Sequence, residues 1–113
     1  MNGYAGQLLR VDLSKDKIVK EPLSGKLREE YIGGEAMACR ILCNEVPPAT
    51  DPWNPENKMI IMTGPLTGTE IPGAVKYCLV TKNIINGFPA ESDASGSFGR
   101  LLKFAGYDGI IIE

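Results

Sequence analysis

Two short stretches carry the side chains that could take part in chemistry, and the first is centred on a lysine. Lys76 lies in an extended run from Val75 to Thr81, where strand alternation would place it on one face with Cys78 and Val80. On a covered face the ammonium would need an anionic partner to offset its desolvation, and a phosphate or a cluster-bound cofactor would serve. On an edge strand the same lysine is simply solvated, so the pattern leaves both interpretations open.

The second stretch, residues 86–109, is predicted to be a small-residue loop that runs into a short helix. Glu91 and Asp93 are two residues apart in this loop, so they are either paired acid and base groups or solvated loop residues. Ser95 and Gly96 precede the helix, where free backbone N–H groups and the helix dipole suit a phosphate or carboxylate. The alternative is an ordinary helix capped by serine hydroxyls. The helix is predicted to end at Gly106, and its apolar face comprises Phe98, Leu101, Leu102 and Ala105.

The three cysteines and the absence of histidine limit the metal and catalytic chemistry of the chain. Cys39 and Cys43 are four residues apart on a predicted helix, and Cys78 lies in a later strand. Because zinc and iron–sulfur sites usually take four ligands, we predict buried thiols and no metal site from the cysteines. Without histidine, catalysis would rest on carboxylates, lysine, tyrosine or cysteine, so a complete active site is not expected.

Length and composition exclude several classes of protein. The chain has 113 residues and a net charge of −2 with both signs interspersed, which predicts one domain spanning 1–113 and disfavours nucleic acid or an anionic membrane as partner. No apolar run is long enough to span a membrane, and the N-terminus lacks the pattern of an export signal. An odd number of cysteines then favours reduced thiols and a cytoplasmic location.

The expected elements alternate between strands and short helices. Turn residues and hydrophobic periodicity predict strands at 6–13, 18–21, 58–63, 75–81 and 109–113, and helices at 26–32, 35–45 and 98–105. The run from Met59 to Met62 is typical of a strand covered on both faces. Trp53 is expected to cover an edge of the core. The last strand is expected to be an open edge that needs a partner strand.

Several strings occur together along the chain. They are Gly6-x-x-Leu-Arg-Val-Asp-Leu13, Pro55-Glu-Asn-Lys-Met-Ile-Ile61, Thr63-Gly-Pro-Leu-Thr-Gly-Thr69, Val80-Thr-Lys82, Gly87-Phe88 and Gly96-x-Phe-Gly-x-x-Leu-Lys-Phe-Ala-Gly-Tyr-Asp108. Over essentially the whole chain they resemble the N-terminal part of the aldehyde ferredoxin oxidoreductase family, the tungsten–pterin enzymes. The resemblance implies an α+β fold, the β-rich half of that N-terminal domain, with one mixed sheet and about three short helices.

The resemblance also implies cofactor contacts, because in that family the domain is a base of two related sheets on which a bis-molybdopterin tungsten cofactor rests. Lys76 falls where the family often has an arginine between the pterin and a [4Fe–4S] cluster. Asp93 falls where a backbone carbonyl, commonly of asparagine, helps to hold a magnesium ion that bridges the pterin phosphates. Ser95 and Gly96 fall in a turn that meets a phosphate through backbone N–H groups, although the serine replaces a glycine.

The function implied by the resemblance is that of a small subunit or N-terminal segment of a ferredoxin-linked aldehyde oxidoreductase. Such a chain would be inactive alone and would carry no cofactor when isolated. The tungsten (or molybdenum) bis-pterin and the [4Fe–4S] cluster would be held mainly by a large partner subunit, a second copy or domains outside this chain, and ferredoxin-linked electron-transfer subunits would be further partners. The alternative is a structural module that pairs with a large oxidoreductase subunit without touching the cofactor.

Overall fold

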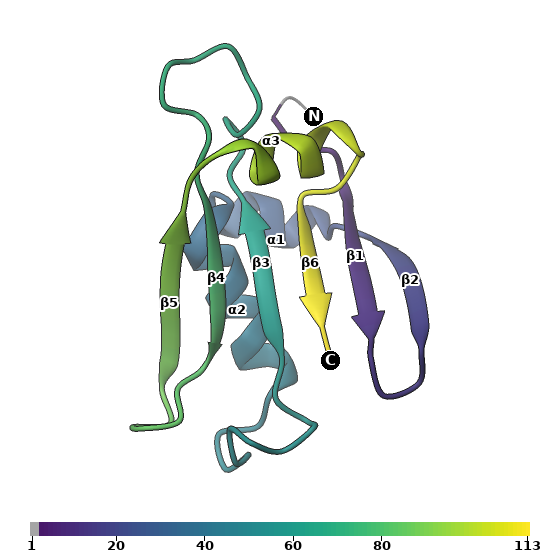
Figure 1. Cartoon of the computed structure of the whole chain (residues 1–113), viewed down its shortest axis with the longest axis vertical. Helices are drawn as coiled ribbons and strands as arrows, with labels where there is room; N and C mark the ends of the chain where they lie inside the picture. Colours follow the sequence, from purple (N-terminus) through teal and green to yellow (C-terminus); the bar gives the residue numbers. More distant parts are fainter. Residues whose placement is uncertain (1–2) are drawn as a thin grey trace.

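The computed structural model describes residues 3–113, which form one six-stranded sheet with three helices (Figure 1). The strands are β1 Gln7–Asp12, β2 Lys17–Pro22, β3 Met59–Thr63, β4 Tyr77–Lys82, β5 Pro89–Ala94 and β6 Gly109–Ile112. The helices are α1 Gly25–Glu30, α2 Gly34–Glu45 and α3 Ser97–Phe104. Across the sheet the order is β2-β1-β6-β3-β4-β5. The pair β1 and β6 is parallel and the other pairs are antiparallel, which confirms the predicted mixed sheet of an α+β fold.

The core lies between α2 and one face of the sheet. Helix α2 turns Met37, Ala38, Ile41 and Leu42 toward the strands, and all four are buried. The side chains that meet them from the sheet are also buried: Leu8, Ile60, Met62, Cys78, Val80 and Ile111. The helix is buried on one face only, because Ala36 and Cys43 are exposed on the other. Within residues 3–113 no helix combines the length and the apolar character that crossing a membrane requires.

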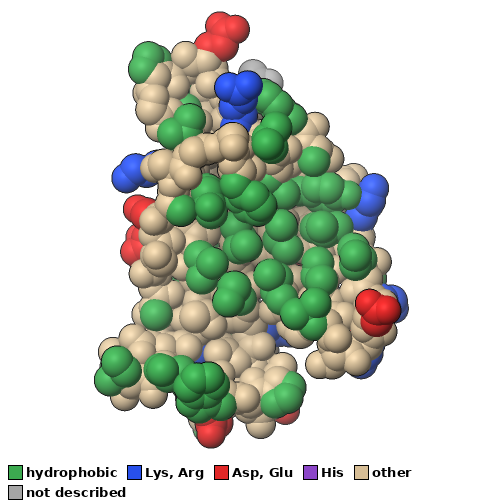
Figure 2. Space-filling model, viewed as in Figure 1, with side chains coloured by type: hydrophobic (Ala, Val, Ile, Leu, Met, Phe, Trp, Pro, Cys, Tyr) green, Lys and Arg blue, Asp and Glu red, His purple; other side chains and the backbone are tan. Residues whose placement is uncertain are grey.

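The opposite face of the sheet has no helix over its centre, as Figure 1 shows with α1 and α2 behind the strands and α3 only at one end. Because side chains alternate between the faces of a strand, this face carries the neighbours of the core residues. We call it the open face; its central side chains are Leu9, Val11, Met59, Ile61, Tyr77, Leu79, Ile110 and Ile112. None of them is buried, and Met59 is 40% exposed. Figure 2 shows hydrophobic side chains gathered over it.

A buried carboxylate fastens the N-terminal segment to the end of α3. Asp108 is 1% exposed and accepts hydrogen bonds from the N–H groups of Ala5 (2.9 Å) and Gly6 (2.7 Å) and from Lys103 Nζ (2.7 Å). The carbonyl of Asp108 accepts the N–H and the hydroxyl of Thr63. Three parts of the chain that are distant in sequence are therefore held at one point, which we call the Asp108 clasp.

Charged side chains close the other end of the core. Arg10 donates from Nε and Nη2 to the Glu21 carboxylate and from Nη1 and Nη2 to the Glu45 carboxylate, at 2.8 to 3.0 Å. Its Nη1 also donates to Glu113 at 3.1 Å. Lys58 pairs with Glu113 and, at 3.8 Å, with Glu45. Burial tends to raise the pKa of the Glu113 carboxyl, but the hydrogen bonds and charges of the two cations lower it overall. This network joins β1, β2, α2 and the end of the chain.

Two expectations about the C-terminal half were wrong. The segment expected to be a loop contains β5, which pairs with β4 in an antiparallel hairpin closed by a hydrogen bond from Asn83 N–H to the Phe88 carbonyl. Its polar sequence suits an outer strand, because only one of its edges is paired. The last strand, expected to be an open edge, lies between β1 and β3 and is paired on both sides.

Three local expectations also differ from the structure. Lys76 precedes β4 instead of lying within it, and it is exposed. Trp53 does not cover the core, since it is 79% exposed on a turn-rich connector that contributes no strand or helix. On α3 only Leu102 of the predicted apolar face is buried, because the helix crosses one end of the sheet and leaves Leu101 57% exposed. Gly106 does cap α3, with φ of 93° and an N–H that donates to the Lys103 carbonyl.

Candidate functional site

The structure brings two of the four predicted site residues to one cavity. A cavity of about 450 Å³ lies beside the start of β4, and both Lys76 and Asp93 line it. Its other walls come from the loop 64–74 between β3 and β4, from the start of α2, and from Tyr77 and Cys78. Most of the lining is apolar, with Ile71, Pro72 and Leu66 on the loop side. Such a cavity, with few polar groups, has the usual character of a site for a small molecule.

Lys76 supplies the positive charge of this cavity. It is exposed, and within the described residues its ammonium makes no ion pair, while its carbonyl accepts a hydrogen bond from Thr67 Oγ1 at 3.0 Å. Thr67 in turn accepts the Gly64 N–H at 3.0 Å, so the loop is fastened to the residue before β4. The position of the lysine backbone is thus fixed while its long side chain stays free to reach a ligand.

Asp93 supplies a negative charge on the outer strand. It pairs with Cys78 across β4 and β5, so its side chain lies on the same side of the sheet as α2. Glu91 lies two residues earlier on that side, and partial desolvation followed by repulsion from Glu35 and Asp93 raises the pKa of its carboxyl. The two carboxylates are therefore exposed, as predicted, but they are neighbours on a strand and not in a loop. A bound phosphate there would need a cation to offset their charge.

Ser95 and Gly96 follow Asp93 closely in the sequence, but neither residue lines the cavity. Gly96 is the N-cap of α3, with φ of 109°, and no side chain hydrogen-bonds to the helix start, so the predicted serine cap is absent. The first N–H groups of α3 thus keep the positive end of the helix dipole without an internal acceptor. Tyr77, which lines the cavity, also contacts α3, because the centre of its ring lies 5.0 Å from that of Phe98.

Two buried polar residues that the sequence did not single out turn out to be structural. Lys82 is 7% exposed and its Nζ donates to the carbonyls of Pro48 and Thr50, each at 2.5 Å, which fastens the connector after α2. The second, Asp108, forms the clasp described above. Each is the last residue of a sequence string quoted above, Val80-Thr-Lys82 or the string that ends at Asp108. A buried charge cannot, however, be recognised before its long-range partners are known.

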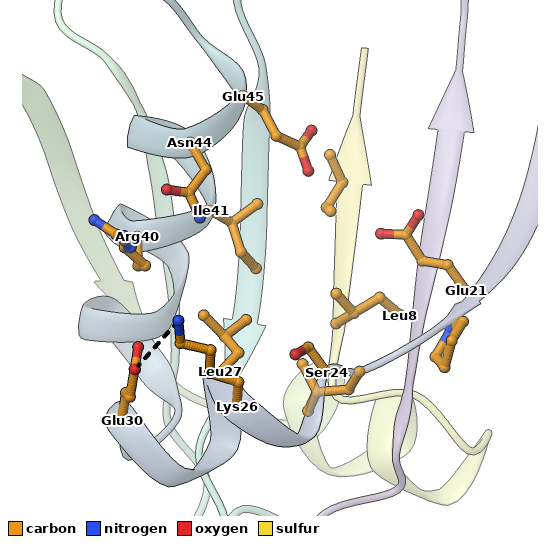
Figure 3. A pocket seen from close by; sticks show the side chains of 13 residues that line it. Leu8, Glu21, Ser24, Lys26, Leu27, Glu30, Arg40, Ile41, Asn44 and Glu45 are labelled. Carbon is orange, nitrogen blue, oxygen red and sulfur yellow. Dashed lines mark ion pairs between the residues drawn. The ribbon is translucent and has the colours of Figure 1, made fainter.

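A further cavity, of about 280 Å³, opens between α1, α2 and β1 and contains none of the predicted site residues (Figure 3). Its walls carry charges of both signs: Arg40 and Glu45 lie on α2, and Lys26 and Glu30 form an ion pair on α1. The 3.8 Å separation and high exposure of that pair make it a weak surface interaction.

The prediction of buried thiols holds fully for Cys78 only. Cys43 is exposed, Cys39 is half-buried, and Cys78 is buried, where desolvation and then the charges of Asp93 and Glu91 raise its pKa to about 11. Among residues 3–113, no group of three or more cysteine, aspartate or glutamate side chains is placed to hold a metal ion. A cluster that needs four thiolates therefore does not fit the cysteines that the structure describes.

Comparison with known proteins identifies the family to which this fold belongs. The family model described as "Aldehyde ferredoxin oxidoreductase, N-terminal domain" matches residues 8–113, and the chain belongs to that family. It is 42% identical over 113 residues to the tungsten-containing aldehyde ferredoxin oxidoreductases of Pyrococcus horikoshii and Pyrococcus furiosus. It is 39% identical to a Pyrococcus furiosus protein named aliphatic sulfonate oxidoreductase, WOR-like subunit.

These matches cover the whole of this chain but only 18–19% of each relative, so the chain spans about a fifth of their length. The fold is also that of a solved structure, the active-site complex BamBC of benzoyl coenzyme A reductase in complex with 1,5-dienoyl-CoA. The TM-score is 0.95 at 34% identity, over 99% of this chain and 17% of that one.

The residues present fit part of the cofactor that this family implies. Lys76 and the uncapped start of α3 suit the phosphates of a pterin, because one offers an ammonium and the other free N–H groups. The unpaired edge of β5 leaves backbone carbonyls free for a cation such as magnesium, and the charge of Asp93 would favour one. When bound, such a group would supply redox chemistry.

Proposed function

We propose that this chain contributes one wall of a tungsten–pterin site to a larger, aldehyde-oxidising and ferredoxin-linked oxidoreductase, either as a small subunit paired with a large one or as the N-terminal segment of the larger protein. Family membership supports an oxidoreductase role. The observation that supports the cofactor contact is that Lys76 and Asp93 line one cavity.

Each of the four residues has a defined part in this proposal. The Lys76 ammonium neutralises a pterin phosphate, and the backbone N–H groups after Ser95 and Gly96 donate to another phosphate oxygen. The Asp93 carbonyl would help to hold a magnesium ion, and the charge of that ion would offset the nearby carboxylates. The lysine ammonium would donate one hydrogen bond to a phosphate, whereas the planar guanidinium of arginine would donate two.

The test compares Lys76→Ala with Lys76→Arg in the assembled complex, with Lys26→Ala on α1 as the matched control because Lys26 is also exposed. Tungsten content and aldehyde oxidation with an artificial electron acceptor are measured for each. Loss of tungsten or turnover in Lys76→Ala alone, restored by arginine, is the expected result. Unchanged values in Lys76→Ala would refute the cofactor contact and favour the alternative, a structural module that pairs with a large oxidoreductase subunit.

A further inference from the structure

A third cavity, of about 400 Å³, lies at the end of the sheet opposite to α3 (Figure 1). It opens between the C-terminal end of α2, the segment that follows this helix, and the hairpin between β4 and β5. Most of its walls are apolar: Leu42, Val46, Pro47, Pro48, Phe88 and Pro89. It shares no lining residue with the cavity of Lys76, and its volume lies in the range that is usual for small-molecule sites.

Lys82 is the one charged residue in the described lining of this cavity. It is 7% exposed, and its Nζ donates to the carbonyls of Pro48 and Thr50. An ammonium has three hydrogens to donate, so these two carbonyls leave one hydrogen for a further acceptor. No carboxylate of residues 3–113 forms an ion pair with Lys82. Because a buried charge without a counter-ion is costly, the cavity favours an anion.

The charged end of Lys82 lies beside the turn of the hairpin. Gly87 lines the cavity, and a Cβ built on it would lie 3.8 Å from Lys82 Cε, the carbon that carries the ammonium. The adjacent Asn86 also lines the cavity, and its Oδ1 accepts the Phe88 N–H at 3.0 Å. The NH2 group of the same amide has no acceptor within the part of the chain that the structure describes. The hairpin side of the cavity therefore offers an ammonium and an amide as hydrogen-bond donors, while the other walls are apolar.

We propose that this cavity binds a small monocarboxylate with an apolar body. Its carboxylate pairs with the Lys82 ammonium, and its hydrocarbon part lies against Val46 and Phe88. A single positive charge matches a carboxylate better than a phosphate monoester, which carries close to two negative charges at neutral pH. Burial of the hydrocarbon part against the apolar walls adds to the affinity. The site is separate from the proposed cofactor contact, because it uses no residue of the Lys76 cavity.

Isothermal titration calorimetry of the full chain with octanoate tests the proposal. Octanamide keeps the hydrocarbon chain without the charge, and acetate keeps the charge without the chain. We expect octanoate to bind at one site per chain, with a Kd lower by about tenfold or more than that of either matched probe. Equal affinity for octanoate and octanamide would overturn the pairing with Lys82. No binding of octanoate at millimolar concentration would overturn the site.

Two substitutions on α2 locate the bound octanoate. Cys43→Phe places a ring in the cavity and leaves Lys82 unchanged, because Cys43 is exposed and lines the cavity. Asn44→Phe is the matched control, since Asn44 is also exposed but lies outside this cavity. The Kd for octanoate should rise about tenfold in Cys43→Phe and stay unchanged in Asn44→Phe. Native affinity in Cys43→Phe would show that octanoate binds elsewhere, such as on the open face, and equal losses in both variants would also overturn the inference.

Lys82→Met tests the ammonium directly. The variant should lose the preference for octanoate over octanamide, and a retained preference would contradict the proposal. Far-ultraviolet circular dichroism checks that the variant is folded, because Lys82 also fastens the segment after α2. If Lys82→Met does not fold, the comparison of octanoate with octanamide on the native chain decides the role of the ammonium. Neither measurement reads metal content or turnover, so its outcome is independent of the Lys76 test.

Discussion

The Asp108 clasp is expected to contribute a large share of the stability of the fold. Asp108→Ala removes the acceptor for two backbone N–H groups and leaves Lys103, whose side chain is 9% exposed, without its carboxylate. Breaking a buried ion pair by removing one partner costs about 3–5 kcal/mol, because the remaining charge stays desolvated. Asp108→Asn keeps the shape and part of the hydrogen bonding, so a smaller loss of about 2 kcal/mol is expected.

The magnitude translates into a clear thermal shift. With an unfolding entropy of about 2.1 cal/mol/K per residue, 113 residues give about 0.24 kcal/mol/K. A loss of about 4 kcal/mol would then lower the Tm by about 17 °C. Thermal unfolding of the purified chain, followed by far-ultraviolet circular dichroism, measures the shift. Glu70→Gln is the control, since this exposed carboxylate has no ion pair in the described structure.

A double-mutant cycle with Lys103→Met separates the ion pair from the backbone contacts. If the carboxylate and the ammonium depend on each other, the double variant loses less stability than the sum of the two single losses. An Asp108→Ala variant within 1 kcal/mol of the control, a margin of about the spread of surface substitutions, would refute the reasoning.

Three further predictions follow from local geometry and charge. Gly109→Ala should lower the free energy of unfolding by at least about 2 kcal/mol, because a Cβ there would lie 2.6 Å from a backbone oxygen of β3; Gly25→Ala, whose Cβ has room, should be neutral or stabilising in chemical denaturation. The pKa of Glu113 is lowered in the folded state, so the stability that this carboxylate contributes is present above its ordinary pKa of 4.5 and is lost as the pH falls through the folded pKa. Glu113→Gln should therefore make the free energy of unfolding depend less steeply on pH in acid. An unchanged acid slope would contradict this. Ellman's reagent should label Cys43 quickly and Cys78 only on unfolding, and rapid labelling of both in the native state would show that the buried thiol is accessible.

Local patterns predicted most of the elements. The alternating run around Leu9, the helical spacing of Met37 and Ile41, and Gly106 at the end of α3 all depend on neighbours close in sequence, and the structure confirms each. The dipeptide Asn86-Gly87 is a hairpin signal that could have revealed β5, but the polar residues after it favoured a loop.

Long-range pairing is what the sequence could not supply. The place of β6 depends on β1, about a hundred residues earlier, and no local rule fixes such a parallel partner. The site was predicted as single residues, and only the fold shows that Lys76 and Asp93 line one cavity while Ser95 and Gly96 do not. The clasp at Asp108 was missed for the same reason, since its donors at Ala5 and Gly6 lie at the other end of the chain.

The central position of β6 has a consequence for biosynthesis. This strand joins the β1 and β2 hairpin to the β3, β4 and β5 meander, so the two parts of the sheet have no strand in common until it is in place. On the ribosome, both parts would wait with unpaired edges until Gly109–Ile112 has left the exit tunnel. Sheet closure is then late and slow, because it joins residues far apart in sequence. Chaperone demand should be greatest during that interval, when one side of β1 and one side of β3 are both unpaired.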